Sequence, residues 1–522
     1  MAEEDLISQK RDPIKSSVVG NMAANRRRQL AVTVGKERRE VLLRAKRLCR
    51  EEDEPADKDI MMDEDEDEDE HNQTAFIVSQ TSQAVEQLKS ALLYQGKGAL
   101  QKKIEALRHL RRLLSKSEVP PVEAAVKAGA VPLLTQCLSF GSPDEQLLEA
   151  AWCLTNIAAG EPEQTKALLP ALPLLIAHLG EKSSMPVAEQ CAWALGNVAG
   201  EGEELRSILL AQGVLSPLAR MMLSNKSSTA RTAAWSLSNL IKGPDPKAAT
   251  ELIRVEGVLD SIVRHLRKAD EELATEVAWV VVYLSALSNF AIGILVKSEI
   301  AQLLAERLAS SESLQLHIPV LRSLGNLVAG DKNTTHVVLV AGHGITDKVM
   351  SALIQCLNSE HRVLKKEAAW VLSNIAAGSI EHKHLIYSSE AVSLLLHLLS
   401  TAPFDIRKEV AYVLGNLCVA PQGGSVQPNV VLEHLVSVVG RGCLPGFINL
   451  VRSADIEAAR LGLQFLELVM RGMPNGEGPK LVEIEDGIDA MERFQFHENE
   501  DLRNMANGLV DKYFGEDYGL DE

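Results

Sequence analysis

The sequence predicts an all-α protein in which about ten similar units stack into a solenoid behind a flexible, basic N-terminal arm. Of its 522 residues 46% are apolar, but only 4% are aromatic. A large core built from Leu, Ala, Val and Ile suits stacked helices better than a β-sandwich. From about residue 83 to residue 515 the apolar residues follow helical patterns almost without a break. One of these patterns returns at a regular interval, which indicates a repeat array.

The recurring element is one helix with a nearly constant sequence. Its copies are AWCLTNIAAG (151–160), AWALGNVAGE (192–201), AWSLSNLIKG (234–243), AWVVVYLSAL (278–287), LRSLGNLVAG (321–330), AWVLSNIAAG (369–378), AYVLGNLCVA (411–420) and a weaker ARLGLQFLEL around Gln464. The Asn-type position recurs at 156, 197, 239, 283, 326, 374 and 416, a spacing of 41 to 48 residues. This period is the armadillo or HEAT signature. Such units bury their faces only against neighbours, so we expect a right-handed armadillo superhelix with a long concave groove.

Charge is distributed very unevenly along the chain. Residues 26–50 contain ten basic and two acidic residues, which gives this segment a net charge of +8. Because the whole chain has a net charge of −17, the remaining residues together carry −25. Residues 63–70 are an unbroken acidic run, which self-repulsion keeps extended. An acidic body suggests basic partners. We therefore divide the chain into a disordered tail (1–25), a basic segment (26–50), an acidic linker (51–82), the solenoid (83–515) and an acidic tail (516–522).

Other function classes find little support in the sequence. The stretch GEGEELR (200–206) lacks the GK[ST] of a phosphate-binding loop, which argues against a nucleotide-dependent enzyme. Seven cysteines are scattered singly, and His382 and His384 have no partners at ligand spacing, so we expect surface histidines and no metal or cofactor. The longest apolar run, 167–179, contains two prolines and is too short to span a bilayer. The acidic body would repel a nucleic acid.

Trp and Asn lie four residues apart in the recurring helix, and hence side by side on one face. We call this the Trp/Asn ladder; its complete pairs are Trp152/Asn156, Trp193/Asn197, Trp235/Asn239 and Trp370/Asn374. One such pair has even odds of being an ordinary core Trp with a satisfied Asn. A regular series fits peptide binding better, because Asn can bond to a peptide backbone and indole faces attract Lys and Arg stems and charges.

Acidic residues recur in phase with the ladder. Five glutamates each lie three or four residues before a Trp-type position, namely Glu149, Glu189, Glu276, Glu367 and Glu409. A sixth, Glu201, follows Asn197 by four residues. Any one of them could belong to an ordinary solvated face. Their recurrence favours a negatively charged, aromatic groove that binds a basic extended segment.

With these residues in place, the chain resembles the importin alpha family over essentially its whole length. The order of basic importin-beta-binding segment, acidic linker and armadillo array is the family's order. So is the ladder, with its interruption at Tyr283 and Arg322. The stretches RDPIKSS, SPDEQLLEAAWCLTNIAAG, HRVLKKEAAWVLSNIAAGS and FHENEDLRNMANGLVDKYFGEDYG are most similar to the divergent plant alpha-nine type.

The resemblance implies a nuclear import adaptor, not an enzyme, that shuttles between cytoplasm and nucleus through nuclear pores. Its partners would be importin beta, cargo proteins with basic nuclear localisation signals, and an export receptor that recycles it. The implied major signal-binding site comprises Trp152, Asn156, Gly160, Thr165, Glu189, Trp193, Asn197, Glu201, Trp235 and Asn239. The implied minor site comprises Tyr283, Arg322, Asn326, Glu367, Trp370, Asn374, Tyr412 and Asn416. The implied importin-beta-binding residues are Arg26, Arg27, Arg28, Lys36, Arg38, Arg39, Arg44, Lys46, Arg47 and Arg50.

Two residues of the implied sites affect these expectations. Glu201 stands where the family commonly has Asp, so the pocket for the key lysine is shifted by one methylene. Arg322 at a Trp position should repel a basic side chain, yet it could pair with a glutamate and shape the pocket. The alternative function is an armadillo scaffold of the catenin type, which explains the repeats but neither the basic arm nor the ladder.

Overall fold

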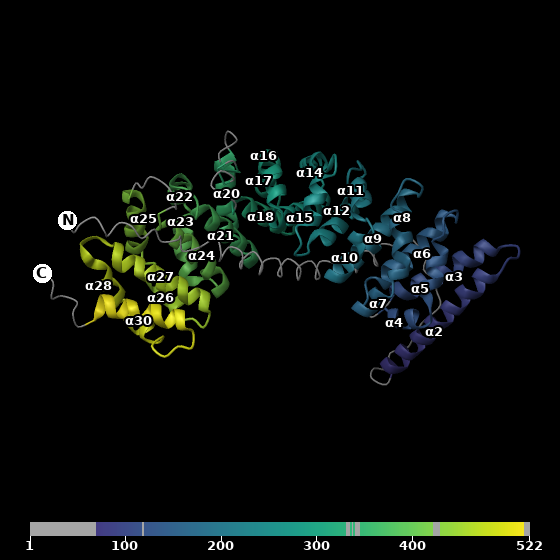
Figure 1. Cartoon of the computed structure of the whole chain (residues 1–522), viewed down its shortest axis with the longest axis horizontal. Helices are drawn as coiled ribbons and strands as arrows, with labels where there is room; N and C mark the ends of the chain where they lie inside the picture. The colour runs from purple at the N-terminus through teal and green to yellow at the C-terminus, as the bar shows by residue number, and fades with distance from the viewer. Residues whose placement is uncertain are drawn as a thin grey trace. The chain divides into compact units, whose positions relative to one another are not determined.

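The computed structural model describes residues 69–116, 120–329, 345–420 and 428–515, together with 335–336 and 338–339. Contacts divide the described chain into two compact units, one ending at Ala291 and the other beginning at Ile292 (Figure 1). The basic arm, the acidic run up to residue 68 and the acidic tail lie outside the described residues. Each unit is considered by itself.

The first unit consists of helices alone in its described part. Its elements are α2 (Asp69–Leu93), α3 (Ala99–Lys116), α4 (Val122–Lys127), α5 (Ala130–Cys137), α6 (Asp144–Ile157), α7 (Pro162–Lys166), η1 (Leu169–Ala171), α8 (Leu172–Ala177), α9 (Met185–Glu201), α10 (Glu203–Ala211), α11 (Leu215–Met222), α12 (Ser227–Ile241), α13 (Lys247–Arg254), α14 (Val258–Arg267) and α15 (Glu271–Leu287).

The second unit continues the same pattern. Its elements are α16 (Asn289–Lys297, which begins just before the border), α17 (Ile300–Ser310), α18 (Leu314–Val328), α20 (Ile345–Asn358), α21 (Arg362–Ala376), α22 (Ile380–Tyr387), α23 (Ala391–Thr401), α24 (Phe404–Leu417), α25 (Pro428–Gly440), α26 (Leu444–Val451), α27 (Ile456–Gly472), η2 (Pro474–Gly476), α28 (Glu477–Ile484), α29 (Gly487–Glu492) and α30 (Glu500–Phe514).

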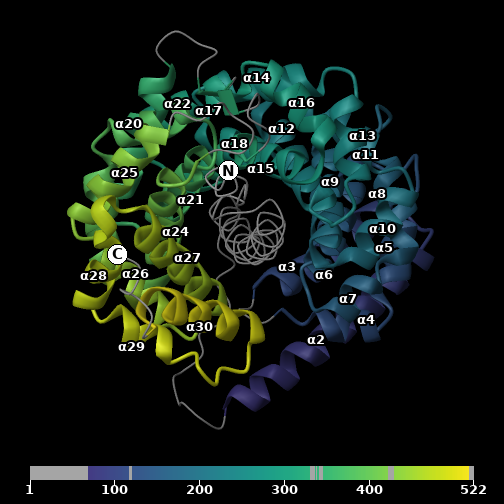
Figure 2. The same ribbon diagram turned by 60° about the vertical axis from the view of Figure 1, so that its left-hand side comes forward.

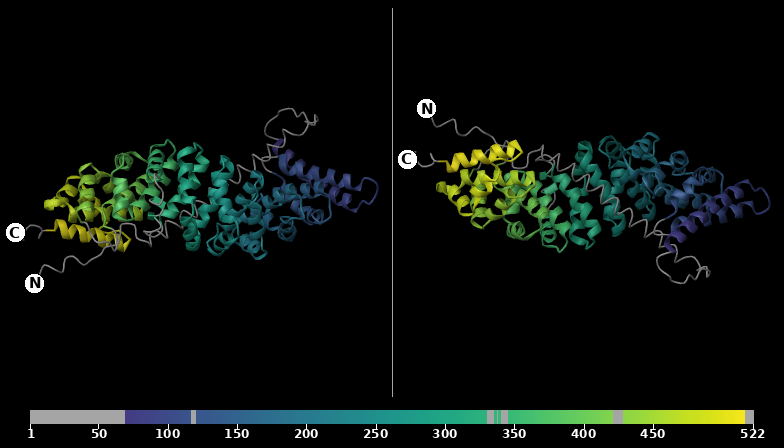
Figure 3. Two further views of the ribbon diagram at one scale, coloured as in Figure 1. Left: turned by 90° about the horizontal axis from the view of Figure 1, so that it is seen from above. Right: turned by 90° about the horizontal axis from the view of Figure 1, so that it is seen from below.

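A typical repeat contributes two outer helices and a third helix that carries the recurring sequence, and the first repeat is described as α2 and α3. In the first unit the third helices α3, α6, α9, α12 and α15 each pack on the next, and in the second unit α18, α21, α24 and α27 do the same. Within each unit taken by itself, Figure 2 shows the third helices as one layer, with the first and second helices behind them. Repeats follow one another in chain order within each unit (Figure 3). The armadillo solenoid of about ten repeats is confirmed.

The core consists of small and aliphatic side chains, as the composition predicts. In α6, Ala151, Leu154 and Ile157 have no exposed surface. They point between helices because the 3.6-residue period turns them away from the Trp/Asn face. The long third helices therefore present one face to the core of their unit and another to the ladder.

The array begins earlier than its charge pattern suggests. Helix α2 starts at Asp69, fourteen residues before the expected boundary at residue 83. Thr81 is already fully buried. The polar composition of 69–82 hides this helical start from sequence reasoning.

Candidate functional site

Three ladder tryptophans of the first unit come from consecutive third helices: Trp152 from α6, Trp193 from α9 and Trp235 from α12. Trp193 is 6% exposed and Trp235 is 3% exposed. Their rings stack on each other, with centroids 4.6 Å apart and planes 15° apart. A methylene stem cannot enter between rings at that distance. The expected lysine position between two indoles is therefore closed at this pair, and cationic side chains would have to approach the ring edges or outer faces.

A glycine makes this ring stack possible. Gly196 precedes Asn197 on α9, and a Cβ atom there would collide with the ring of Trp235. In the second unit Gly325 lies in the same way under the ring of Trp370. The Gly–Asn pair of the repeat thus serves two purposes. The glycine seats the indole of the following repeat, and the Asn beside it faces the ladder.

The ladder asparagines are anchored to the helix before them. Asn197 Nδ2 donates to the carbonyl oxygen of Thr155 over 3.1 Å. Asn374 Nδ2 donates to the Gly325 carbonyl over 2.9 Å, and Asn416 Nδ2 to the Ser373 carbonyl over 3.0 Å. Each accepting residue directly precedes the Asn-type position of the preceding repeat. The side-chain amides are therefore held in fixed orientations by the repeat geometry itself.

This anchoring uses only part of each amide's capacity. An amide carries two N–H donors and an acceptor oxygen. The buried Oδ1 atoms of Asn197 and Asn416 have no hydrogen-bond partner among the described residues. Asn239 is oriented differently: its Oδ1 accepts from Lys242 Nζ over 3.1 Å, and its buried Nδ2 has no partner in the described part of the chain. Buried polar atoms in this state normally indicate a missing water or ligand.

Three of the six in-phase glutamates already have cationic partners within the protein. Glu149 accepts from Arg111 Nε over 2.7 Å, Glu189 from Lys226 Nζ over 2.9 Å, and Glu367 from Arg322 Nη2 over 2.9 Å. Burial opposes ionisation of Glu189, but hydrogen bonds from Thr229, Lys226 and Ser228 outweigh it and hold the pKa of Glu189 below its usual range. These ion pairs neutralise much of the charge of the three glutamates within the protein. The expected acidity of the ladder is reduced accordingly.

The remaining expected major-site residues lie at or near the C-terminal ends of third helices, with Thr165 in the short helix α7 that follows α6. Asn156 Nδ2 donates to Ser115 Oγ over 2.9 Å. Thr165 is 1% exposed, and its Oγ1 donates to the carbonyl oxygen of Ala158 over 3.3 Å, at the C-terminal end of α6. Gly160 is half-buried just beyond that end, and Glu201 is the half-buried last residue of α9.

The expected minor-site residues belong to the second unit, except for Tyr283. Arg322 is 4% exposed and Glu367 is 3% exposed, and the guanidinium holds the carboxylate with both Nε and Nη2, which matches the pairing expected of Arg322. Tyr412 donates its hydroxyl to Glu457 over 2.9 Å. Asn326 and Asn374 are half-buried and Asn416 is buried. Tyr283 is in the first unit, with its ring centroid 6.2 Å from that of Trp279.

Sequence reasoning missed Arg111 in α3. Its guanidinium carbon lies 4.6 Å from the centroid of the Trp152 ring, while its Nε bonds to Glu149. Arg111 and Ser115 occupy the Trp and Asn positions of the first repeat, because they precede Trp152 and Asn156 by 41 residues. The same period that revealed the ladder could have identified this pair. Its different residue types concealed it.

The expectation of two surface histidines is wrong for His382. Its side chain is 1% exposed, and it caps α22 together with Ser379, while His384 is exposed as expected. Burial lowers the pKa of His382. The neighbouring Lys383 is also buried and donates to the carbonyl oxygens of Ala376 and Asn416, at the ends of two third helices. Burial lowers the pKa of Lys383 to about 8.

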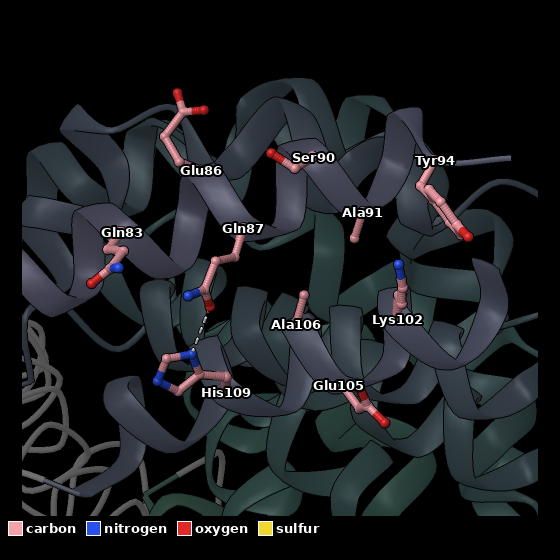
Figure 4. Close-up of a pocket in the computed structure, with 10 residues that line it drawn as sticks. All are labelled: Gln83, Glu86, Gln87, Ser90, Ala91, Tyr94, Lys102, Glu105, Ala106 and His109. Carbon is pink, nitrogen blue, oxygen red and sulfur yellow. Dashed lines mark hydrogen bonds between the residues drawn. The ribbon is translucent and has the colours of Figure 1, made fainter. Parts of the chain in front are cut away.

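A separate groove of about 670 Å³ lies between α2 and α3 (Figure 4). Tyr94 and Lys102 face each other there, with the ammonium 3.7 Å from the ring centroid, and His109 contacts Gln87 over 3.1 Å. None of the expected site residues lines it. No group of His, Cys, Asp or Glu in the described ranges is placed to share a metal ion. No single described helix is long and apolar enough to cross a membrane, but the bent pair Val430–Gly440 and Leu444–Val451 reaches that threshold together.

Comparison with known proteins gives a consistent result. The armadillo/beta-catenin-like repeat family matches residues 118–159, 202–242, 345–377 and 379–419, and the HEAT-like repeat family matches 144–198. Among solved structures, the crystal structure of an engineered protein aligns with a TM-score of 0.70 and 25% identity, over 81% of this chain and 97% of that one.

Two plant proteins are similar to the chain from end to end. Importin subunit alpha-9 of Arabidopsis thaliana is 68% identical over 528 residues, covering 100% of both chains. Importin subunit alpha-2 of Oryza sativa subsp. japonica is 66% identical, covering 98% of this chain and 96% of the relative. Identity at this level over full length confirms the resemblance seen in the sequence: the chain belongs to the importin alpha family, in its divergent alpha-9 type.

Proposed function

We propose that this protein is a nuclear import adaptor whose Trp/Asn ladder binds basic nuclear localisation signals on cargo proteins. The observation that carries the proposal is the row of anchored asparagines, and Asn197 above all. Its Nδ2 is fixed to Thr155, and its buried Oδ1 has no partner among the described residues. A backbone N–H of an extended peptide would satisfy that oxygen, and the second amide N–H would serve a peptide carbonyl.

The preference for basic side chains is supported by a contact inside the protein. Arg111 lies over the ring of Trp152 and bonds to Glu149, so ladder residues already hold one cation through an indole and a carboxylate. Such cation–π contacts gain strength when they are desolvated. The major site would be the residues of α6, α9 and α12, and the minor site those of α18, α21 and α24.

The basic segment would recruit importin beta, and the adaptor would cycle between cytoplasm and nucleus with the help of an export receptor. Family membership and the charge of +8 over residues 26–50 support this part. We expect the reversal Arg39→Glu, Arg44→Glu, Arg47→Glu to abolish importin beta binding, because it changes the charge of the segment from +8 to +2. The assay is pull-down of purified importin beta on the immobilised full chain.

The thermal melting of the triple variant serves as its control and should equal that of the unaltered protein, since the substituted residues lie outside the repeats. A matched variant that reverses Arg231, Arg264 and Arg267, which belong to the solenoid, should retain importin beta. Importin beta binding that survives the reversal in the basic segment would place the contact elsewhere.

A further inference from the structure

The described third helices carry either Trp or a carboxylate-bound residue at the ladder position, which is the position four residues before the Asn-type residue. Five of these positions hold Trp: 152, 193, 235, 279 and 370. The other four hold Arg111, Arg322, Tyr412 and Arg460. Three of these side chains bond to a carboxylate of the next third helix, namely Glu149, Glu367 and Glu457, and Arg460 bonds to Asp501 of α30. The four positions without Trp are therefore alike, because the polar group of each is bonded to a carboxylate.

The carboxylate-bound residues flank the Trp-lined stretches within each unit. Arg111 precedes Trp152 at the start of the ladder in the first unit. In the second unit, Arg322 precedes Trp370 and Tyr412 follows it. A position whose side chain is bonded to a carboxylate offers a ligand neither an indole nor an uncompensated charge. Such a position on the ladder therefore marks the point beyond which a Lys or Arg of the bound peptide is no longer recognised.

Arg111 shows this most directly, because it also covers an indole. Its guanidinium carbon is 4.6 Å from the Trp152 ring centroid, and its Nε donates to Glu149 over 2.7 Å. Arg111 and Glu149 are each 8% exposed. Arg108 adds a second, longer approach of 3.5 Å to Glu149 from a side chain that is 36% exposed. The arrangement contains the elements of a bound basic residue: a cation, an aromatic face and a carboxylate.

We propose that Arg111 is a specificity-determining residue that occupies the basic-residue position at Trp152 from within the protein. Because Arg111 fills this position, a bound signal gains no affinity from a Lys or Arg placed there. The basic residues that the signal requires therefore end before they reach the first repeat. Glu149 holds Arg111 over the ring and would accept a ligand cation if Arg111 were removed. This inference rests on the proposed function, since it defines the peptide selectivity of the same ladder.

The test compares basic signal peptides that share one core and differ by Lys or Ala at the first residue flanking that core, on either side. Affinities are measured by fluorescence anisotropy with the full chain. For the unaltered protein we expect the Lys and Ala peptides to differ by less than about twofold. For Arg111→Ala we expect the Lys peptide to bind about tenfold more tightly than the Ala peptide at one of the two flanks, because a desolvated cation–π contact becomes available.

Two further variants separate this role from a merely structural one. Adding Glu149→Gln to Arg111→Ala should remove the new preference for Lys, since the carboxylate that receives the cation is neutralised. Arg254→Ala is the matched control, because Arg254 lies 4.6 Å from the ring centroid of Phe290, between α13 and α16 and outside the third helices. It should leave the Lys-to-Ala ratio unchanged. If Arg111→Ala does not fold by circular dichroism, Arg111→Gln keeps the aliphatic stem and tests the same point.

The outcomes distinguish this inference from the proposed function. An unaltered protein that does not bind the core peptide overturns the proposed function. If the core peptide binds but the ratio of Lys-peptide to Ala-peptide affinity is the same in the Arg111 variants as in the unaltered protein, only the role of Arg111 is overturned.

Discussion

Replacing Trp193 and Asn197 together by Ala should weaken binding of a monopartite basic signal by about 2–4 kcal/mol, or ~30- to ~800-fold, as expected for a buried hot spot. The substitution removes an indole of the ladder and the amide whose buried oxygen lacks a partner in the described chain. It also removes the anchor from Asn197 to Thr155. Isothermal titration with the full chain measures the effect.

A matched substitution addresses the structural cost of this change. Trp370→Ala with Asn374→Ala removes the same two side chains from the second unit, including the bond from Asn374 to Gly325. It should cost similar packing but leave the affinity of a short signal for the first unit within about twofold. Both variants must retain their helical circular dichroism. A Trp193/Asn197 variant that folds and binds the signal as tightly as the unaltered protein would show that the site is assigned wrongly.

Glu367→Ala should destabilise the second unit by about 3–5 kcal/mol, because it leaves the buried guanidinium of Arg322 without its carboxylate. Arg322 and Glu367 side chains are 5% and 4% exposed, so water cannot replace the lost partner. For a unit of roughly 200 residues, the midpoint of thermal unfolding should fall by roughly 6–20 °C. Differential scanning calorimetry resolves this as a downward shift of one transition.

Two controls determine whether burial causes that effect. Arg322→Met combined with Glu367→Leu replaces the pair by apolar side chains and should restore most of the stability, since no charge is left buried. Arg362→Ala breaks an exposed pair with Asp405, whose side chains are 63% and 29% exposed, and should cost about 0–1 kcal/mol. A Glu367→Ala shift no larger than that of Arg362→Ala would contradict a structural role for the buried pair.

The repeat period and the core could be predicted from sequence because both depend on local periodicity. Residues such as Leu154 and Ile157 recur with the helical period, and their burial follows from which side of α6 they occupy. The pairing of Arg322 with a glutamate was also predictable. An arginine at an aromatic position of a packed helix needs a carboxylate nearby, and Glu367 was in phase.

The finer geometry of the ladder could not be predicted, because it depends on how neighbouring third helices pack. The bond from Asn197 to Thr155 joins residues 42 positions apart and requires the register between α6 and α9. The direct stack of Trp193 on Trp235 depends on the absence of a Cβ at Gly196. The early start of α2 at Asp69 was hidden because an acidic segment reads equally well as a linker.

The most direct test of the central claim measures binding of the full chain to an immobilised basic localisation signal. Two immobilised ligands serve as comparisons: the same peptide with its lysines and arginines replaced by alanine, and double-stranded DNA of equal length. Surface plasmon resonance at two salt concentrations gives all three affinities. We predict saturable binding to the basic peptide that weakens at high salt, with at least about 100-fold weaker binding to the neutral peptide and to DNA. Equal binding to the basic and neutral peptides, or tighter binding to DNA, would contradict the account.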